Sequence, residues 1–360
     1  MMKRLTLICC LLVLLALALY APGSLAQNSV LDYRDDFRIL DMCAGQRDEI
    51  ILCGNTDMPS NPTPTLICCD SQGNVIWEIR SPDTPGLYSR AVWLTQDQLL
   101  AVRYEQDNDD TCLLEIVDSG EILREIRLPG NARQAFPVQD GVMLFVRDAS
   151  GQLSLTLIGT DGTPAWSALL PERIWLDALV QSGDVYIAAG YTINAASEAQ
   201  GLVLTLDSTG EVLWRYDSPS IETLSEVLPC DSGFYVAGDT LDSESGIEYG
   251  SLLFFDGESL VYRAGSAKNA LSRMGQRTLD AYLSDSGCTL VLKEMRKHGL
   301  LYLQSFDENG EIVSKQEMDI APILSVLSAR VFDGPVHLVA TGYCETWNYQ
   351  KYVTVLCHGE

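Results

Sequence analysis

The segment from Gly201 to Asp217 constrains the fold more than any other part of the sequence. Its first half, Leu202 to Leu206, is an apolar run that is too short for a globular helix and is typical of a strand. A turn follows, because Gly210 can adopt a positive φ and the Asp207 side chain can accept hydrogen bonds from the turn backbone. Apolar and polar residues then alternate, with Val212, Trp214 and Tyr216 on one face. The segment therefore predicts a β-hairpin.

This hairpin turn recurs along the chain at intervals of roughly 43 to 51 residues, which indicates a repeat of four short strands. The turn aspartates are Asp70, Asp118, Asp161, Asp207, Asp256 and Asp307. Trp77, Trp166 and Trp214 occupy the same place after the turn glycine in three of the units. A second series of Asp/Ser-Gly turns is interleaved with the first, as at Asp140-Gly141 and Ser182-Gly183. Repeats of this length are typical of β-propeller blades.

The repeats predict an all-β fold, a seven-bladed β-propeller of four-stranded blades. The last unit lacks a final strand before the C-terminus. Val30 to Asp35 has the pattern of Val212 to Asp217 and precedes the first unit, so we expect it to pair with Tyr352 to Cys357 and close the ring. Residues 27–360 would then form a single domain.

The N-terminus has the pattern of a secretory signal peptide, residues 1–26. Lys3 and Arg4 precede the apolar run Leu5 to Tyr20, and small residues end at Ala26, where we expect cleavage. The prediction is a secreted or extracellular protein with no membrane span after cleavage. The alternative is a protein anchored to the membrane by an uncleaved segment.

The net charge restricts the class of partner, and the cysteine content indicates whether the thiols are free or form disulfides. The formal net charge of −25 argues against nucleic acid as a partner, because the chain would repel phosphate backbones. Nine cysteines lie outside the signal, an odd number without Cys-x-x-Cys spacing and mostly within apolar strands. Buried free thiols are therefore favoured over a disulfide framework.

The hairpin sequence Leu-Asp-Ser-Thr-Gly-Glu-Val-Leu-Trp at 206–214 resembles the repeat of the quinoprotein-like propellers, the pyrroloquinoline-quinone-type repeat family. The resemblance is closest around Gly210 and Gly73. It implies a propeller, and the family includes both quinone-dependent dehydrogenases and scaffolds without a cofactor. The chain has about seven units and no added cytochrome or long insertion, which favours the scaffolds. Cys68 and Cys69 are similar to the adjacent cysteines of the enzymes, or are two small apolar residues that end a strand.

No motif for catalysis is present: the sequence has no nucleophile elbow, Walker loop, dinucleotide fingerprint or metal-type histidine spacing. We therefore expect no catalytic residue, metal or cofactor, and a non-catalytic binding or scaffold function. The alternative is an enzyme on a propeller scaffold, either a quinone- or metal-dependent oxidoreductase or a carbohydrate-active hydrolase with a carboxylate pair.

We expect a protein, peptide or carbohydrate partner on the face that carries the long connections, such as Tyr191 to Gln200 and Asp239 to Gly250. Two groups of residues are candidates for ligand binding. One is a basic group that suits an anionic partner, or else pairs with local acids such as Asp280 and Glu294. The other is an aromatic group that would stack on a sugar or peptide, or else pack against the closing strand. The candidates are Lys268, Arg273, Arg277, Arg296, Lys297, His298, Tyr343, Trp347 and Tyr349.

Overall fold

The computed structural model describes residues 29–31, 37–45, 48–56, 62–83, 85–105, 111–171, 173–266, 275–285, 287–294, 300–321, 323, 325–332, 336–345 and 350–358. Within these ranges the protein is all-β, as predicted, and contains strands and no helix. The described residues include no helix that is long and apolar enough to cross a membrane. The expected signal peptide lies outside them.

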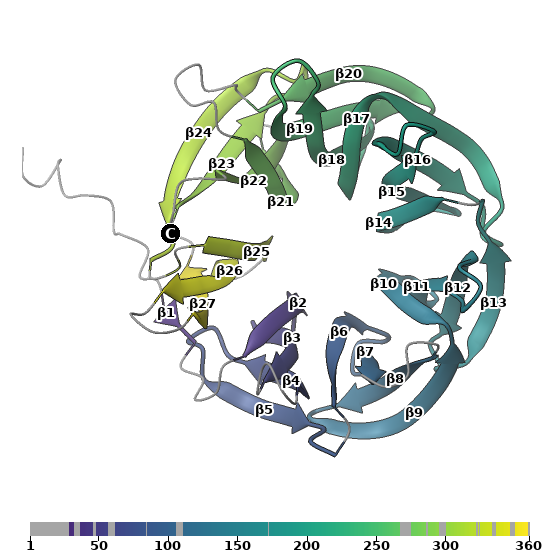
Figure 1. Ribbon diagram of the computed structural model, residues 1–360, viewed down its shortest axis with the longest axis vertical. Helices are drawn as coiled ribbons and strands as arrows, with labels where there is room; N and C mark the ends of the chain where they lie inside the picture. The colour runs from purple at the N-terminus through teal and green to yellow at the C-terminus, as the bar shows by residue number, and fades with distance from the viewer. Residues whose placement is uncertain are drawn as a thin grey trace, which may run out of the picture.

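Within the described ranges the strands form six antiparallel sheets, which Figure 1 shows arranged around a common centre. Three four-stranded sheets come first along the chain: β2 (Arg38–Ala44), β3 (Ile50–Thr56), β4 (Thr63–Cys69) and β5 (Val75–Arg80); β6 (Gly86–Trp93), β7 (Leu99–Glu105), β8 (Thr111–Asp118) and β9 (Glu121–Pro129); and β10 (Asn131–Val138), β11 (Gly141–Arg147), β12 (Leu153–Gly159) and β13 (Pro164–Leu169).

A seven-stranded sheet follows: β14 (Ile174–Ser182), β15 (Val185–Ile193), β16 (Ala199–Leu206), β17 (Val212–Cys230), β18 (Gly233–Asp242), β19 (Ile247–Asp256) and β20 (Ser259–Gly265). The first half of β17 pairs with β16 and its second half pairs with β18. This one strand therefore runs from the outside of one group of strands to the inside of the next (Figure 1).

Two further four-stranded sheets complete the described structure. The first holds β21 (Gln276–Ser284), β22 (Gly287–Glu294), β23 (Leu300–Phe306) and β24 (Ile312–Asp319). The second holds β25 (Ser325–Val331), β26 (Val336–Glu345), β27 (Gln350–His358) and β1 (Ser29–Val30). Val30 lies opposite Val355, and the Leu31 N–H donates to the Thr354 carbonyl at 3.1 Å. The predicted pairing of the N-terminal segment is thus present at these residues, while residues 32–36 lie outside the described ranges.

The middle strands of each sheet are buried on both faces, which confirms the sequence pattern. β3 and β4 are buried along their whole lengths, whereas the outer strand β24 is exposed along nearly all of its length. The apolar cores lie between neighbouring sheets. In one of them, Leu155 of β12 packs with Leu176 of β14 and Leu204 of β16.

The recurring turn fixes how one sheet meets the next. The Asp207 carboxylate accepts the N–H groups of Thr209 and Glu211 at 2.8 and 2.9 Å, and Gly210 has a φ of +83°. A Cβ atom at Gly210 would lie 2.8 Å from the Trp166 ring of the preceding sheet. Gly120 meets Trp77 in the same way, so two of the three repeated tryptophans form the surface on which the next glycine turn packs.

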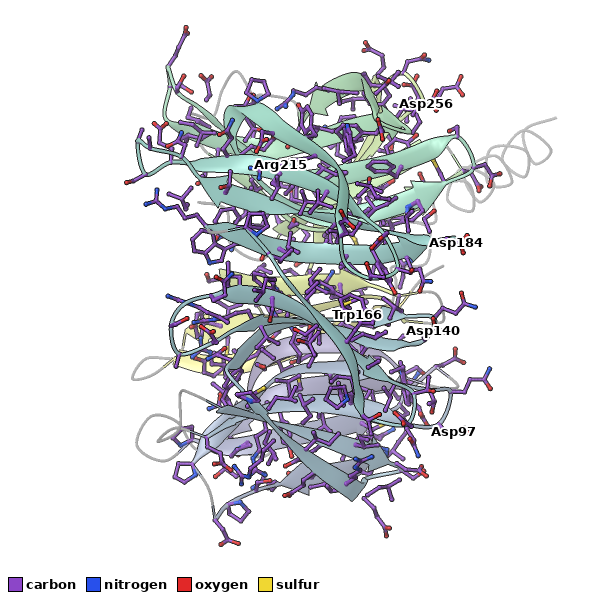
Figure 2. The ribbon with its side chains drawn as sticks, turned by 90° about the vertical axis from the view of Figure 1, so that its right-hand side faces the viewer. Asp97, Asp140, Trp166, Asp184, Arg215 and Asp256 are labelled. Carbon is purple, nitrogen blue, oxygen red and sulfur yellow. The ribbon has the colours of Figure 1, made fainter. Side chains whose placement is uncertain are left out.

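The turns sort into two faces. Figure 2 shows Asp97, Asp140, Asp184 and Asp256, all from tight turns, along one side of the molecule. We call this the tight-turn face and the opposite one the long-loop face. Two of the connections predicted to be long loops consist of strand over half or more of their residues. Ile193 still pairs with Ala199, and Asp242 with Ile247, because polar and β-branched residues keep the ladder going almost to the turn.

Candidate functional site

The inner strands share a β-bulge at the same place, and this bulge directs polar side chains into the centre of the ring. The register shifts fall between Ile39 and Asp41 in β2, and at equivalent positions in β6, β10, β14, β17, β21 and β25. Because a bulge adds one residue, the two core side chains on either side of it are three residues apart instead of two or four. Leu224 and Val227 are an example. The residue before the second core position is freed to face the channel. In β14 that position is Ala178, and the polar residue is Asp177, one residue earlier. We call the seven polar residues the polar girdle: Asp41, Arg90, Gln134, Asp177, Glu226, Asp280 and Ser328.

Hydrogen bonds link much of the girdle from sheet to sheet. Arg90 Nε donates to Gln134 Oε1 at 2.6 Å, and Gln134 Nε2 donates to Asp177 Oδ1 at 3.3 Å. On the other side of the ring, Arg330 Nη1 bridges Glu226 Oε1 at 2.7 Å and Asp280 Oδ1 at 3.1 Å. Two carboxylates thus share one guanidinium.

The girdle separates two cavities on the axis. The outer cavity, of about 630 Å³, is lined by girdle residues together with Asp239, Arg277 and Lys293. The inner cavity, of about 300 Å³, is lined by five of the girdle residues and by apolar ones such as Trp93 and Phe136; the five are Asp41, Arg90, Gln134, Asp177 and Glu226. Arg277 lies near the start of β21, and Asp239 and Lys293 lie near the ends of β18 and β22. These strand ends lead to the long-loop face, so the outer cavity is the mouth of the channel on that face.

Side chains of positive and of negative charge are both present at the mouth of the channel. Arg277 lies directly opposite Lys293 in the ladder between β21 and β22. Arg277 Nε is 3.6 Å from Asp239 Oδ2, and its side chain is 58% exposed. Lys293 Nζ donates to the Val326 carbonyl at 3.0 Å. Burial, together with the positive charge of Arg277, lowers the pKa of Lys293.

The channel carboxylates have raised pKa values. Burial raises the pKa of Glu226 to about 7, against the opposing effect of Arg330. Burial likewise raises the pKa of Asp239 to about 6 and raises that of Asp177. These groups hold a proton more readily than exposed carboxyls and favour a hydrogen-bond donor or a cation beside them.

Of the candidates named from the sequence, the described residues include Arg277 and Tyr343. Arg277 is the second residue of β21. The prediction that it lies in the preceding connection is therefore wrong. Tyr343 is within β26, not in a loop, and packs on its ladder partner Tyr352 with ring centroids 4.9 Å apart. Strand pairing continues past the predicted end because the two tyrosines face each other across the ladder. Lys268, Arg273, Arg296, Lys297, His298, Trp347 and Tyr349 lie outside the described residues.

Two other parts of the sequence prediction concern buried side chains. All nine described cysteines are free, which confirms the prediction of free thiols. Cys68 packs in the core between the first two sheets, whereas Cys69 packs in the core on the other face of β4. Side chains on opposite faces cannot jointly contact one ligand. The pair therefore does not fit the cofactor site that the family resemblance suggests.

The structure also contains buried acids that the sequence does not single out. Glu222 in β17 accepts hydrogen bonds from three hydroxyls and one guanidinium; the donors are Ser218, Thr240, Ser251 and Arg263. Glu115 in β8 accepts from Tyr88 and from Arg103. The donors to each acid come from strands of its own sheet, and neither acid lines the two cavities. Among the described residues, no group of three or more His, Cys, Asp or Glu is arranged to hold a metal ion.

The girdle has a sequence signal that the hairpin repeat obscures. In every inner strand except β14 a polar residue at this position is followed by a small or apolar one, as in Asp41-Met42, Arg90-Ala91, Glu226-Val227 and Asp280-Ala281. The signal lies outside the turns, so a search based on turns does not find it.

No protein-family model matches the chain, and no curated protein matches it. Among solved structures 401 chains match. One is a complex of KlAtg21 with the coiled-coil of AgAtg16, at a TM-score of 0.55 and 13% sequence identity, over 89% of this chain and 100% of that one. This likeness concerns the fold alone, because one fold serves many functions. Together with the ring of antiparallel sheets, it defines an all-β protein of the β-propeller type.

Proposed function

We propose that the protein is a secreted, non-catalytic binding or scaffold protein, built as a closed ring of seven four-stranded blades, with its partner docked on the long-loop face. The seven-stranded sheet counts as two blades if β17 is the last strand of one and the first strand of the next. β1 supplies the fourth strand of the last blade. Gly73 of the first blade then packs on Leu31 as Gly210 packs on Trp166, since a Cβ there would lie 3.4 Å from Leu31 Cα.

Removing residues 27–36 tests the ring. The deletion would expose the edge of β27 and the apolar residues that Leu31 covers, so we expect the free energy of unfolding to fall by several kcal/mol. Chemical denaturation followed by intrinsic fluorescence measures this change. The substitution Leu31→Asp should reproduce part of the loss, while Arg215→Gln on the outer strand should not. A deletion variant as stable as the parent protein would argue against closure.

The outer cavity carries the functional part of the proposal. It opens on the long-loop face and combines Arg277, Lys293 and Asp239 with the girdle carboxylates, the kind of concave polar surface that orients a ligand. A protein, peptide or carbohydrate partner fits such a surface, and an anionic group would pair with Arg277 and Lys293. That KlAtg21 forms a complex with a coiled-coil favours a protein or peptide among these classes.

Binding to glycan and peptide arrays tests this function. We expect the parent protein to retain a set of ligands that a double variant, Arg277→Gln with Lys293→Met, loses. The matched control is Arg215→Gln, which removes a cation from the outer strand β17. Ligands retained equally by all three proteins would place binding elsewhere.

Two assays address the enzyme alternatives. Titration with pyrroloquinoline quinone and Ca²⁺ should give no stoichiometric cofactor spectrum, and chromogenic glycosides should not be hydrolysed. Asp177 and Glu226 are two of the four carboxylates that line the outer cavity, where a hydrolase would need a carboxylate pair. Hydrolysis that disappears in Glu226→Gln, or a stoichiometric quinone spectrum, would overturn the non-catalytic proposal.

A further inference from the structure

The outer cavity differs in charge from the rest of the molecule. Across the sequence, 49 acidic residues outnumber 24 basic ones. The charged residues that line this cavity are balanced, with as many basic as acidic side chains: Arg90, Arg277, Lys293 and Arg330 against Asp41, Asp177, Glu226 and Asp239. A surface of this composition suits a ligand that carries charges of both signs.

The basic end of the cavity is poorly neutralised by the described residues. Arg277 and Lys293 are ladder partners whose side chains both line the cavity. Their described contacts are one ion pair at 3.6 Å, between Arg277 and Asp239, and one hydrogen bond from Lys293 to a carbonyl. Two cations this close favour an anion between them, because the anion would interact with both.

The acidic end of the cavity, formed by Glu226 and Asp177, also has charged groups that are only partly paired. Glu226 binds Arg330 through Oε1, and Asp177 binds Gln134 through Oδ1. Within the described ranges, Glu226 Oε2 and Asp177 Oδ2 have no hydrogen-bond donor beside them. Burial already disfavours the charged form of both acids, so an ammonium group placed here would regain the interaction that water no longer supplies.

An apolar strip lies beside these charges. Leu40, Leu279 and Leu327, from three successive inner strands, line the outer cavity, and Leu327 is 38% exposed. The bulge positions these leucines next to the girdle residues. The cavity thus offers an anion site, a cation site and an apolar surface.

We propose that the outer cavity binds a short peptide with free termini. Its carboxylate would pair with Arg277 and Lys293, its ammonium group with Glu226 and Asp177, and an apolar side chain would cover Leu327 and its neighbours. The basic residues come from β21 and β22 and the acidic ones from β14 and β17, and a short peptide carries both of the charged groups that would pair with them. A volume of about 630 Å³ is within the range of small-ligand sites. This inference rests on the proposed binding function.

The experiment compares tripeptides with a central leucine in three forms: unblocked, N-acetylated and C-amidated. Ligand-observed NMR and calorimetry measure binding to the full chain. We expect unblocked peptides to bind and each block to weaken binding by about tenfold. Free glycine and free leucine provide the comparison for single amino acids.

Matched variants assign each end of the peptide. Glu226→Gln should weaken the unblocked peptides about tenfold and leave the N-acetylated ones unchanged. Lys293→Met should weaken the unblocked peptides and leave the C-amidated ones unchanged. Arg215→Gln is the control and should change nothing. Far-UV circular dichroism confirms that each variant is folded, and Asp177→Asn replaces Glu226→Gln if that variant fails to fold.

The results test the peptide proposal and the binding proposal separately. Equal binding of all three peptide forms, or the absence of binding by any, overturns the peptide proposal. If array ligands are still lost in the double variant while no tripeptide binds, the binding function stands and the peptide assignment is wrong. If neither arrays nor tripeptides show binding that depends on Arg277 and Lys293, both proposals fail.

Discussion

Glu222 and Glu226 lie four residues apart in the same strand, β17, yet they occupy opposite chemical environments. Glu222 has a fully buried side chain and accepts hydrogen bonds from four neighbouring side chains. Glu226 has one described partner, Arg330, and a side chain that is 18% exposed to the channel. The bulge between Leu224 and Glu226 separates them, because it reverses the alternation of the strand. One inserted residue thus separates an acid that links neighbouring strands of its sheet from an acid available to a ligand.

The largest effect should come from removing the fully buried acid, Glu222. Glu222→Ala would leave the Arg263 guanidinium and three hydroxyls without their acceptor, and we expect it to lower the free energy of unfolding by about 3 to 5 kcal/mol. Urea denaturation measures the loss. Glu222→Gln keeps one acceptor and should cost less. If Glu226→Ala is as damaging as Glu222→Ala, the distinction between the two acids is wrong.

A smaller loss should follow from adding one methyl group where two sheets meet. Gly210→Ala would place a Cβ atom against Trp166 at a φ of +83°, so crowding and backbone strain add to about 2 to 4 kcal/mol. Gly246→Ala is the control, since its φ is +66° and nothing lies within 4 Å of the added atom. It should show the strain alone, about 1 kcal/mol. Equal melting temperatures for the two variants would show that the sheets are less tightly packed than described.

The smallest effect should be a change in pH dependence at the channel. The pKa of Glu226 is raised from 4.5 to about 7 in the folded state, so the folded protein binds more protons than the unfolded chain between these values. Stability from this group is present below pH 4.5 and is lost as the pH rises to about 7. Relative to the parent, Glu226→Gln should gain about 1 to 3 kcal/mol across that window. Melting curves at several pH values measure it, and parallel profiles would contradict the raised pKa.

The sequence predicts the parts of the fold that depend on local chemistry. The turn at Asp207 to Gly210 needs a side-chain acceptor and a glycine, both visible in the sequence, and the apolar runs reveal the buried middle strands. The sequence does not reveal where strands continue beyond the apolar run, so Tyr343 is wrongly placed in a loop. Nor does it reveal the girdle, because Glu226 would face a core in a regular strand and faces the channel only because of a bulge. Arg277 is brought beside Asp239 by the packing of two sheets, which no local pattern encodes.

The packing of Gly73 has a consequence for the order in which the chain is made. Turns such as those at Gly120 and Gly210 rest on a sheet that has already been synthesised, whereas the neighbours of Gly73 are Leu31 and Leu356, from the two ends of the sequence. The sheet that contains Gly73 must therefore keep this flank uncovered until Leu356 has been synthesised. A nascent chain arrested before Leu356 should remain sensitive to protease near Gly73, although most of its sheets are already in place.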